Sequence, residues 1–303
     1  MYQYPKNILS IPELIQKLKD SGMLIESQDE AETALASIGY YRLKGYCFHL
    51  YNKSENRYNE GVCFSNVLKL YYFDSEVSHL LFSYLSQIEV SLRARLVNAL
   101  LIYNDPLILN DPSAFDSKSL YWKNQGSIAF EVVRSNDVFI NHNFKNHDGA
   151  IPLWAAVEVM SFGTLSKVIK TLKTGTNSAF SVLAKHYQFQ SKNCNLVTPS
   201  KKMLTSWIQS VSAMRNICAH SSRIYNRSIN TIPTLIWSDF TDSAPPKYNG
   251  LYQIILSMKY LRPTNESWNS FVSEFNELLK KYEDVVELNK LNFPVDWSDH
   301  FLV

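Results

Sequence analysis

Several features that would assign a function at once are missing from this sequence. It has no glycine-rich nucleotide-binding motif, internal repeat or low-complexity run, so neither a phosphate loop nor a repeat architecture is predicted. Its four cysteines form no Cys-x-x-Cys pair, and we expect them to be reduced residues of a cytoplasmic protein. No apolar run approaches the length of about 18 residues that suggests a membrane span, and the N-terminus lacks a signal-peptide pattern.

An excess of charge of one sign is also missing. The 303 residues include 30 Lys and Arg against 28 Asp and Glu, which leaves a formal net charge of +2 and a pI near 8.2. A surface for nucleic acid must therefore be a local basic patch. Hydrophobic residues make up 46% of the chain and aromatic residues 13%, which is ample for a core and argues against disorder.

Helical periodicity dominates the pattern, and strand signals are few. Residues 64–103 contain no Gly or Pro, and their apolar residues recur every three or four positions, which predicts a helix of about ten turns. The same reasoning predicts helices at 10–20, 28–38, 127–141, 178–187, 203–226, 251–260 and 266–282, two within 152–173 separated by a break at 162–164, a turn-rich connector at 104–126 and an irregular tract at 232–250. The predicted fold class is all-α.

The stretch Arg215–Arg227, RNICAHSSRIYNR, carries the densest group of candidate functional residues. If one helix spans it, Asn216, His220, Arg223 and Arg227 fall within about 40° of one line along the helix surface, and Arg215 lies on the flank. An imidazole can take or give a proton, and a guanidinium can hold a phosphate through two hydrogen bonds. This combination predicts RNA cleavage that needs no metal or other cofactor.

Two basic residues, Arg42 and Lys44, interrupt an aromatic segment at 38–51. Alternating aromatic and basic side chains can form a surface for single-stranded RNA, on which bases stack and phosphates bind. The alternative is a buried aromatic wedge that docks the N-terminal helices.

Glu89 and Arg93 lie four residues apart on the long predicted helix. They form either a surface ion pair of little energetic weight or part of the site. In the second case they face the helix of His220, where Glu89 orients Arg215 or Arg93 contacts a phosphate.

His142 and His147, with Asp148 beside the second, are spaced five apart before Gly149 and Pro152. The spacing is not that of a zinc site, and no cysteine accompanies it. We therefore predict a solvated loop there and no metal site.

The central stretch resembles the R-N-x-x-A-H-x-x-R-x-x-N-R signature of the Abi family of AbiD/AbiF-like abortive-infection proteins, whose fold belongs to the HEPN superfamily of helical ribonucleases. Residues 71–96, YYFDSEVSHLLFSYLSQIEVSLRARL, resemble the family's L-Y-x-F-D-x-x-L-R…I-E-x-x-L-R block, with Val77 and Ser78 where Leu and Arg are usual. Residues 154–166 resemble its W-x-x-x-E-x-x-S-F-G-x-L-S block.

The resemblance implies an N-terminal helical lobe at 1–60 and an HEPN-type helical bundle at 61–303, packed as one unit. It implies an endoribonuclease of phage defence, or an RNA-regulated toxin, that leaves 2′,3′-cyclic phosphate and 5′-hydroxyl ends. The expected residues are Arg215, Asn216 and His220 for catalysis, Arg223, Arg227, Arg42 and Lys44 for RNA binding, and Glu89 and Arg93 for support of the site.

The expected partners are RNA, which is the substrate and could also be a non-coding RNA antitoxin, and a second copy of the chain, because the chain contains one such motif. Two other hypotheses stay open at this point. In one, the same residues hold a structured RNA without cleaving it. In the other, Arg215 and His220 belong to a buried polar network at a dimer interface.

Overall fold

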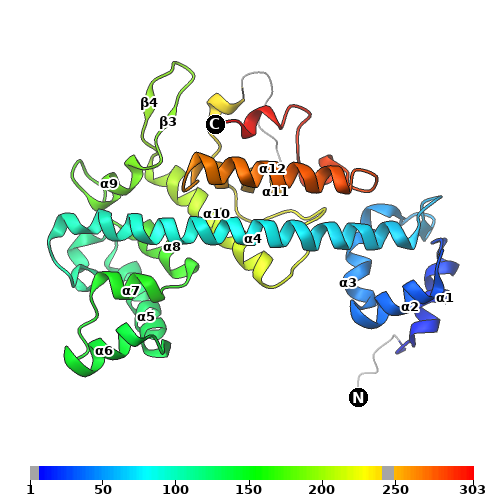
Figure 1. Cartoon of the computed structure of the whole chain (residues 1–303), viewed down its shortest axis with the longest axis horizontal. Coiled ribbons are helices and arrows are strands. Elements are labelled where there is room, and N and C mark those ends of the chain that lie inside the picture. The colour runs from blue at the N-terminus through cyan, green and yellow to red at the C-terminus, as the bar shows by residue number, and fades with distance from the viewer. Residues whose placement is uncertain (1–6, 241–248) are drawn as a thin grey trace.

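The computed structural model describes residues 7–240 and 249–303. One helix, α4 (Phe64–Leu100), runs the width of the molecule in Figure 1, and all other parts are arranged along it. Its 37 residues span about 55 Å at 1.5 Å per residue. The predicted long helix at 64–103 is confirmed, with its last three residues in a 3₁₀ turn.

A small lobe formed by the N-terminal residues sits at one end of α4, in blue in Figure 1. It contains α1 (Ile11–Asp20), α2 (Gln28–Ser37), α3 (Tyr40–Lys44), a 3₁₀ segment at Gly45–Leu50 and a hairpin of β1 (Tyr51–Asn52) and β2 (Arg57–Tyr58). Gly39 makes the turn between α2 and α3 with a φ of 91°, a conformation that costs glycine little. We call this part the N-terminal lobe.

Five helices and a second hairpin lie around the other end of α4, in green in Figure 1. They are α5 (Lys118–Arg134), α6 (Val138–Asn146), α7 (Leu153–Val159), α8 (Phe162–Thr171) and α9 (Ala179–Lys185), with β3 (Phe189–Gln190) and β4 (Leu196–Val197). α5 starts nine residues before the predicted position, because the Ser117 side chain accepts a hydrogen bond from Leu120 N and caps the helix there. The predicted solvated loop around His142 is instead α6.

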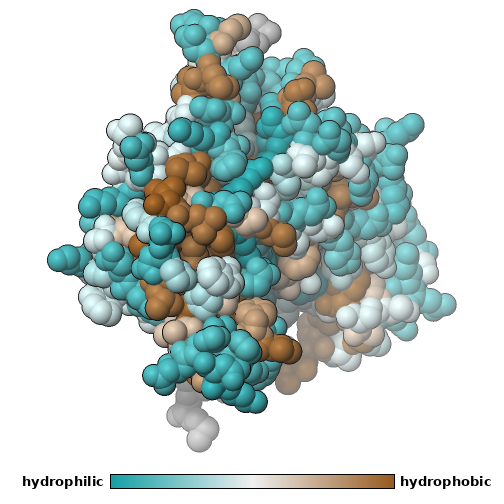
Figure 2. Space-filling view, turned by 60° about the vertical axis from the view of Figure 1, so that its left-hand side comes forward, coloured by the Kyte–Doolittle hydropathy of each residue, from teal (hydrophilic) through white to brown (hydrophobic). Residues whose placement is uncertain are grey.

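Apolar side chains gather on the face that Figure 2 turns toward the viewer. Helices at this end of the molecule expose several large ones, namely Trp122, Phe130, Val133, Val138 and Trp154. Trp154 of α7 is 55% exposed.

Three further helices complete the bundle: α10 (Lys201–Ala219), α11 (Leu251–Tyr260) and α12 (Asn265–Lys281). α10 packs against α4, α8 and α11, and α12 packs against α4. Every residue of α11 is buried, as expected of a helix enclosed on all sides. The irregular tract predicted at 232–250 lies partly outside the described residues, since 241–248 are not described.

The all-α fold class is confirmed, since the described strands form two sheets of two strands each. A single hydrophobic cluster extends from Ile15 in α1 to Phe301 near the C-terminus. No helix in the described ranges has the length and apolar character needed to cross a membrane.

Candidate functional site

The helix that carries Arg215 ends earlier than its sequence pattern predicts. α10 stops at Ala219, His220 occupies the C-cap position, and Ser221 takes a positive φ of 46°. The predicted helix through residue 226 is therefore wrong. Asn216 and His220 are both exposed and remain one helical turn apart, since His220 N donates to Asn216 O at 3.1 Å.

Asp74 of α4 binds the chain just after it leaves the helix. Its buried carboxylate accepts hydrogen bonds from Ile224 N at 3.0 Å, from Tyr225 N at 2.5 Å and from the Tyr46 hydroxyl at 2.9 Å. Burial raises the pKa of Asp74, and these three donors act in the opposite direction. The carboxylate thus joins α4, the N-terminal lobe and the segment 220–227, which we call the His220 loop.

The sequence indicated Asp74 only as a polar position on a long helix, so its role was missed. An available signal is that Asp74 stands at the Asp of the L-Y-x-F-D block, directly after Phe73. Buried carboxylates of this kind need several donors.

Arg223 and Arg227 hold the His220 loop together and do not continue the face of α10. Arg223 Nη1 donates to Tyr225 O and, at 3.0 Å, to Asn226 O, while Arg227 Nη1 donates to Arg223 O at 3.2 Å. The helical-face argument for these two residues is therefore wrong. Arg227 is exposed, and RNA binding by either residue stays a prediction.

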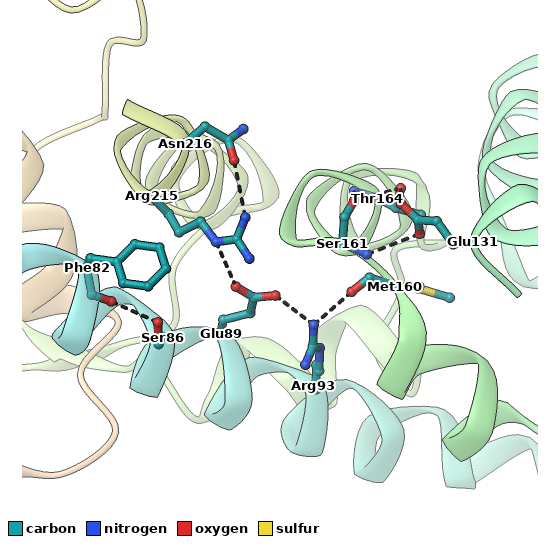
Figure 3. Close-up of polar contacts among 10 residues, drawn as sticks. All are labelled: Phe82, Ser86, Glu89, Arg93, Glu131, Met160, Ser161, Thr164, Arg215 and Asn216. Carbon is teal, nitrogen blue, oxygen red and sulfur yellow. Dashed lines mark hydrogen bonds and ion pairs between the residues drawn. The ribbon is translucent and has the colours of Figure 1, made fainter. Parts of the chain in front are cut away.

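A buried carboxylate, Glu89 of α4, lies between two arginines, as Figure 3 shows. Glu89 Oε1 lies 2.6 Å from Arg93 Nη2, and Glu89 Oε2 lies 3.4 Å from Arg215 Nε. Arg93 Nη2 also donates to Met160 O at 2.8 Å. The predicted contact of Glu89 with Arg215 is confirmed. The predicted ion pair of Glu89 with Arg93 is also present, but its expected place on the surface is wrong, because only 6% of the Glu89 side chain is exposed.

The guanidinium of Arg215 keeps donors available for a ligand. Its Nε is close enough to Glu89 for an ion pair but lies outside hydrogen-bond geometry, and its Nη1 reaches Asn216 Oδ1 only at 3.5 Å. The group lies over the Phe82 ring, 5.8 Å from the ring centre, and 30% of the side chain is exposed. Because a guanidinium has five N–H donors, the Nη atoms can bind an anion while Glu89 holds the other edge.

The imidazole of His220 has a different environment. It is exposed, and it makes no hydrogen bond or ion pair with any residue that the structure describes. Five residues along a helix correspond to roughly 140° of rotation, so Arg215 and His220 of one chain point in different directions. Arg215 is directed to α4, whereas His220 shares a face with Asn216.

The N-terminal lobe contacts the His220 loop through Arg42, whose Nη1 donates to Ser221 O at 2.6 Å. A small polar cavity of about 70 Å³ at this junction is lined by Arg42, Ser75, His79 and Ser222, among others. His79, a second histidine beside the loop, was not recognised as a candidate from the sequence. Lys44, predicted with Arg42 to bind RNA, lies on a different cavity of the same lobe.

The two histidines considered for a metal site lie close together, with ring centres 5.2 Å apart. In residues 7–240 and 249–303, no three His, Cys, Asp or Glu side chains form a group that could hold a metal ion. The absence of a metal requirement stays a prediction.

The fold and the site define an all-α protein with a buried carboxylate, an anchored arginine and an exposed histidine on its central helices. The sequence model described as "Abi-like protein" matches residues 33–226, from α2 to the His220 loop. Because these 194 residues are more than half of the chain, the protein belongs to the Abi-like protein family. No curated protein and no solved structure matches it.

Proposed function

We propose that this protein is a metal-independent endoribonuclease of the HEPN type, which acts in phage defence by abortive infection or as an RNA-regulated toxin in the cytoplasm. Membership of the Abi-like family supports the defence role. The observation that carries the chemistry is the Arg215 guanidinium, anchored on one edge by buried Glu89 and open on the other, at the end of the helix that presents His220.

The proposed reaction is transesterification within the RNA. The 2′-oxygen attacks the adjacent phosphorus while the bond to the 5′-oxygen breaks, which leaves a 2′,3′-cyclic phosphate and a 5′-hydroxyl. His220 takes the 2′-hydroxyl proton or protonates the departing oxygen. The free Nη donors of Arg215 hold the charge that builds on the phosphate oxygens. Asn216 fixes the imidazole or binds a phosphate oxygen.

We propose that the working site is shared between two chains. One imidazole serves one proton-transfer role at a time, and Arg215 and His220 of one chain diverge around α10. A symmetric dimer brings the arginine of one chain to the histidine of the other. RNA is the proposed substrate, and a structured non-coding RNA is a candidate for restraining the activity.

Mixing two inactive variants tests the shared site. If Arg215 and His220 act across the dimer, a heterodimer of Arg215→Ala and His220→Ala contains one complete site. Each heterodimer should then have up to half of the activity of a wild-type dimer, which contains two complete sites. If both residues act within one chain, no combination of these variants contains a complete site. An inactive mixture of verified heterodimers would rule out a shared site that consists of Arg215 of one chain and a single His220 of the other.

Cleavage itself is tested by expressing the wild type, His220→Ala and His147→Ala in bacteria and reading the 3′-end chemistry of total RNA. His147 is a matched control, because it is exposed and lies in the loop after α6. We expect growth arrest and cyclic phosphate ends with the wild type and with His147→Ala, and neither with His220→Ala. Purified protein should retain the activity in EDTA.

Intact RNA with all three proteins, together with RNA that co-purifies, would instead favour a module that binds RNA without cleaving it. A marked fall in melting temperature for His220→Ala would favour a structural role at an interface. The exposure of His220 argues against that role within a single chain.

A further inference from the structure

A second cavity, of about 320 Å³, lies in the N-terminal lobe, and no residue of the His220 loop lines it. Its walls come from α1, α3, the 3₁₀ segment and the β1–β2 hairpin. The volume is within the range of cavities that bind small organic molecules. None of the described residues that line the cavity is Asp or Glu.

Four aromatic residues, Tyr40, Phe48, Tyr51 and Tyr58, line this cavity. The rings of Tyr51 and Tyr58 meet edge to face with centres 5.0 Å apart, and the Tyr51 hydroxyl donates to Asn56 Oδ1 at 2.8 Å. Tyr58 is buried, whereas Phe48 is 58% exposed. The cavity therefore has aromatic walls that are held in place at the bottom and accessible at the rim, as base stacking requires.

Three lysines surround the same cavity: Lys17 from α1, Lys44 from α3 and Lys53 from the hairpin. All three are exposed, and none forms an ion pair with a residue in the described part of the chain. Burial raises the pKa of Cys47, which also lines the cavity, to about 11, so its thiol adds no negative charge. In a chain of net charge +2, this is a local basic patch with no acid among the residues that line the cavity.

Aromatic walls alone would suit an apolar ligand, and lysines alone would suit a small anion. Together they match a ligand that has a flat aromatic part and a negative part. We propose that the N-terminal lobe binds one nucleotide in this cavity, with the base against the aromatic rings and the phosphate at the three lysines.

The position of the cavity indicates how such a site would serve the proposed function. Lys44 lines the cavity, and Arg42, two residues earlier on α3, contacts Ser221 beside His220. The two faces of α3 are about 10 Å apart, a distance that a short single strand spans. An RNA held by one unpaired nucleotide in the cavity would thus be led toward His220. This link rests on the proposed function, whereas nucleotide binding does not.

The test measures binding to the full-length chain carrying His220→Ala, so that no cleavage interferes. A fluorescently labelled, unstructured RNA decamer is the probe. Adding Lys17→Glu and Lys53→Glu should raise its Kd by about 10-fold or more. The matched control combines Lys19→Glu and Lys118→Glu. These two changes alter the net charge as much as the cavity pair does, at exposed positions outside the cavity. They should raise the Kd by no more than about 2-fold.

A second pair of variants tests the aromatic wall. Tyr40→Leu keeps an apolar side chain but removes the ring, and should raise the Kd by about 5- to 100-fold. Tyr40→Phe keeps the ring and should bind as the parent does. Circular dichroism melting checks that each variant is folded, and the lysine variants remain informative if Tyr40→Leu is not.

The outcomes separate the two proposals. Equal weakening by the cavity and control lysine pairs, or no effect of either pair, would overturn the nucleotide site whether or not the wild type cleaves RNA. A loss of RNA affinity in the cavity variants but not in the control variants would support the nucleotide site even if the wild type does not cleave RNA. Competition by AMP, GMP, CMP or UMP as strong as that of the unlabelled decamer would identify a free nucleotide as the ligand, and much weaker competition would identify RNA.

Discussion

Replacing Glu89 by Gln tests the centre of the candidate site. The glutamine has the shape of the glutamate, but only its amide oxygen can accept a hydrogen bond. Its NH₂ group must then face Arg93 or Arg215, both of which are donors. In the native protein the carboxylate accepts from Arg93 at 2.6 Å and lies 3.4 Å from Arg215 Nε.

The size of the effect follows from burial. A hydrogen bond to a charged group contributes about 1.5–3 kcal/mol, and loss of a partner in a fully buried ion pair costs about 3–5 kcal/mol. Here the carboxylate is 6% exposed, but Arg93 and Arg215 are 19% and 30% exposed, so solvent screens part of the loss. We expect a loss of about 2 kcal/mol, or a fall of about 3 °C in Tm for a chain of this length.

The same change should lower RNA cleavage by about 10- to 100-fold, because Arg215 loses the group that orients it. Thermal melting measures the first effect, and single-turnover cleavage at a temperature where the variant is folded measures the second. Asp284→Asn is the control, since Asp284 pairs with Lys69 where both side chains are about half exposed. It should cost less than about 1 kcal/mol and leave cleavage unchanged.

If Glu89→Gln has the same Tm as the wild type, the carboxylate contributes no net stabilisation through the two arginines. Unchanged cleavage together with a lowered Tm would show that Glu89 supports the fold but does not orient Arg215 for the reaction.

Two other changes follow from the same contacts. Asp74→Asn should destabilise the fold by about 2 kcal/mol and slow cleavage. The reason is that an amide cannot accept from Ile224 N, Tyr225 N and the Tyr46 hydroxyl together. A chemical-denaturation midpoint equal to that of the wild type would contradict this prediction. Burial lowers the pKa of His49, so the unfolded chain binds more protons below about pH 6.5, and stability should fall as the pH drops through this range. The free energy of unfolding, measured by denaturation at pH 7.5 and pH 5, should change less between the two pH values for His49→Asn than for the wild type. An equal change in both proteins would contradict the assignment of this pH dependence to His49.

Some boundaries were not predictable from local sequence. The break between α7 and α8 was expected at 162–164 and lies at residues 160–161, where Ser161 caps Thr164 N and both Ser161 N and the Thr164 hydroxyl donate to Glu131 of α5. The cap itself is local, but the two hydrogen bonds to Glu131 involve a carboxylate about 30 residues away along the chain. Helix periodicity alone does not contain that information.

The sequence by itself determined the all-α class, the long helix α4 and, to within one residue, α11 and α12, because hydrophobic spacing and the absence of Gly and Pro act locally. It also identified Arg215, Asn216, His220 and Glu89 as candidates.

Only the tertiary structure decided where α10 ends and which of the two arrangements expected for Glu89 is present. Asp74 accepts backbone hydrogen bonds from Ile224 and Tyr225, 150 and 151 positions away, and residues 220–226 do not continue the helix. Glu89 has Arg93 on its own helix but meets Arg215 only because α4 and α10 pack together. Buried carboxylates must find donors wherever packing supplies them, so the sequence did not identify the donors of Asp74 and left two arrangements open for Glu89.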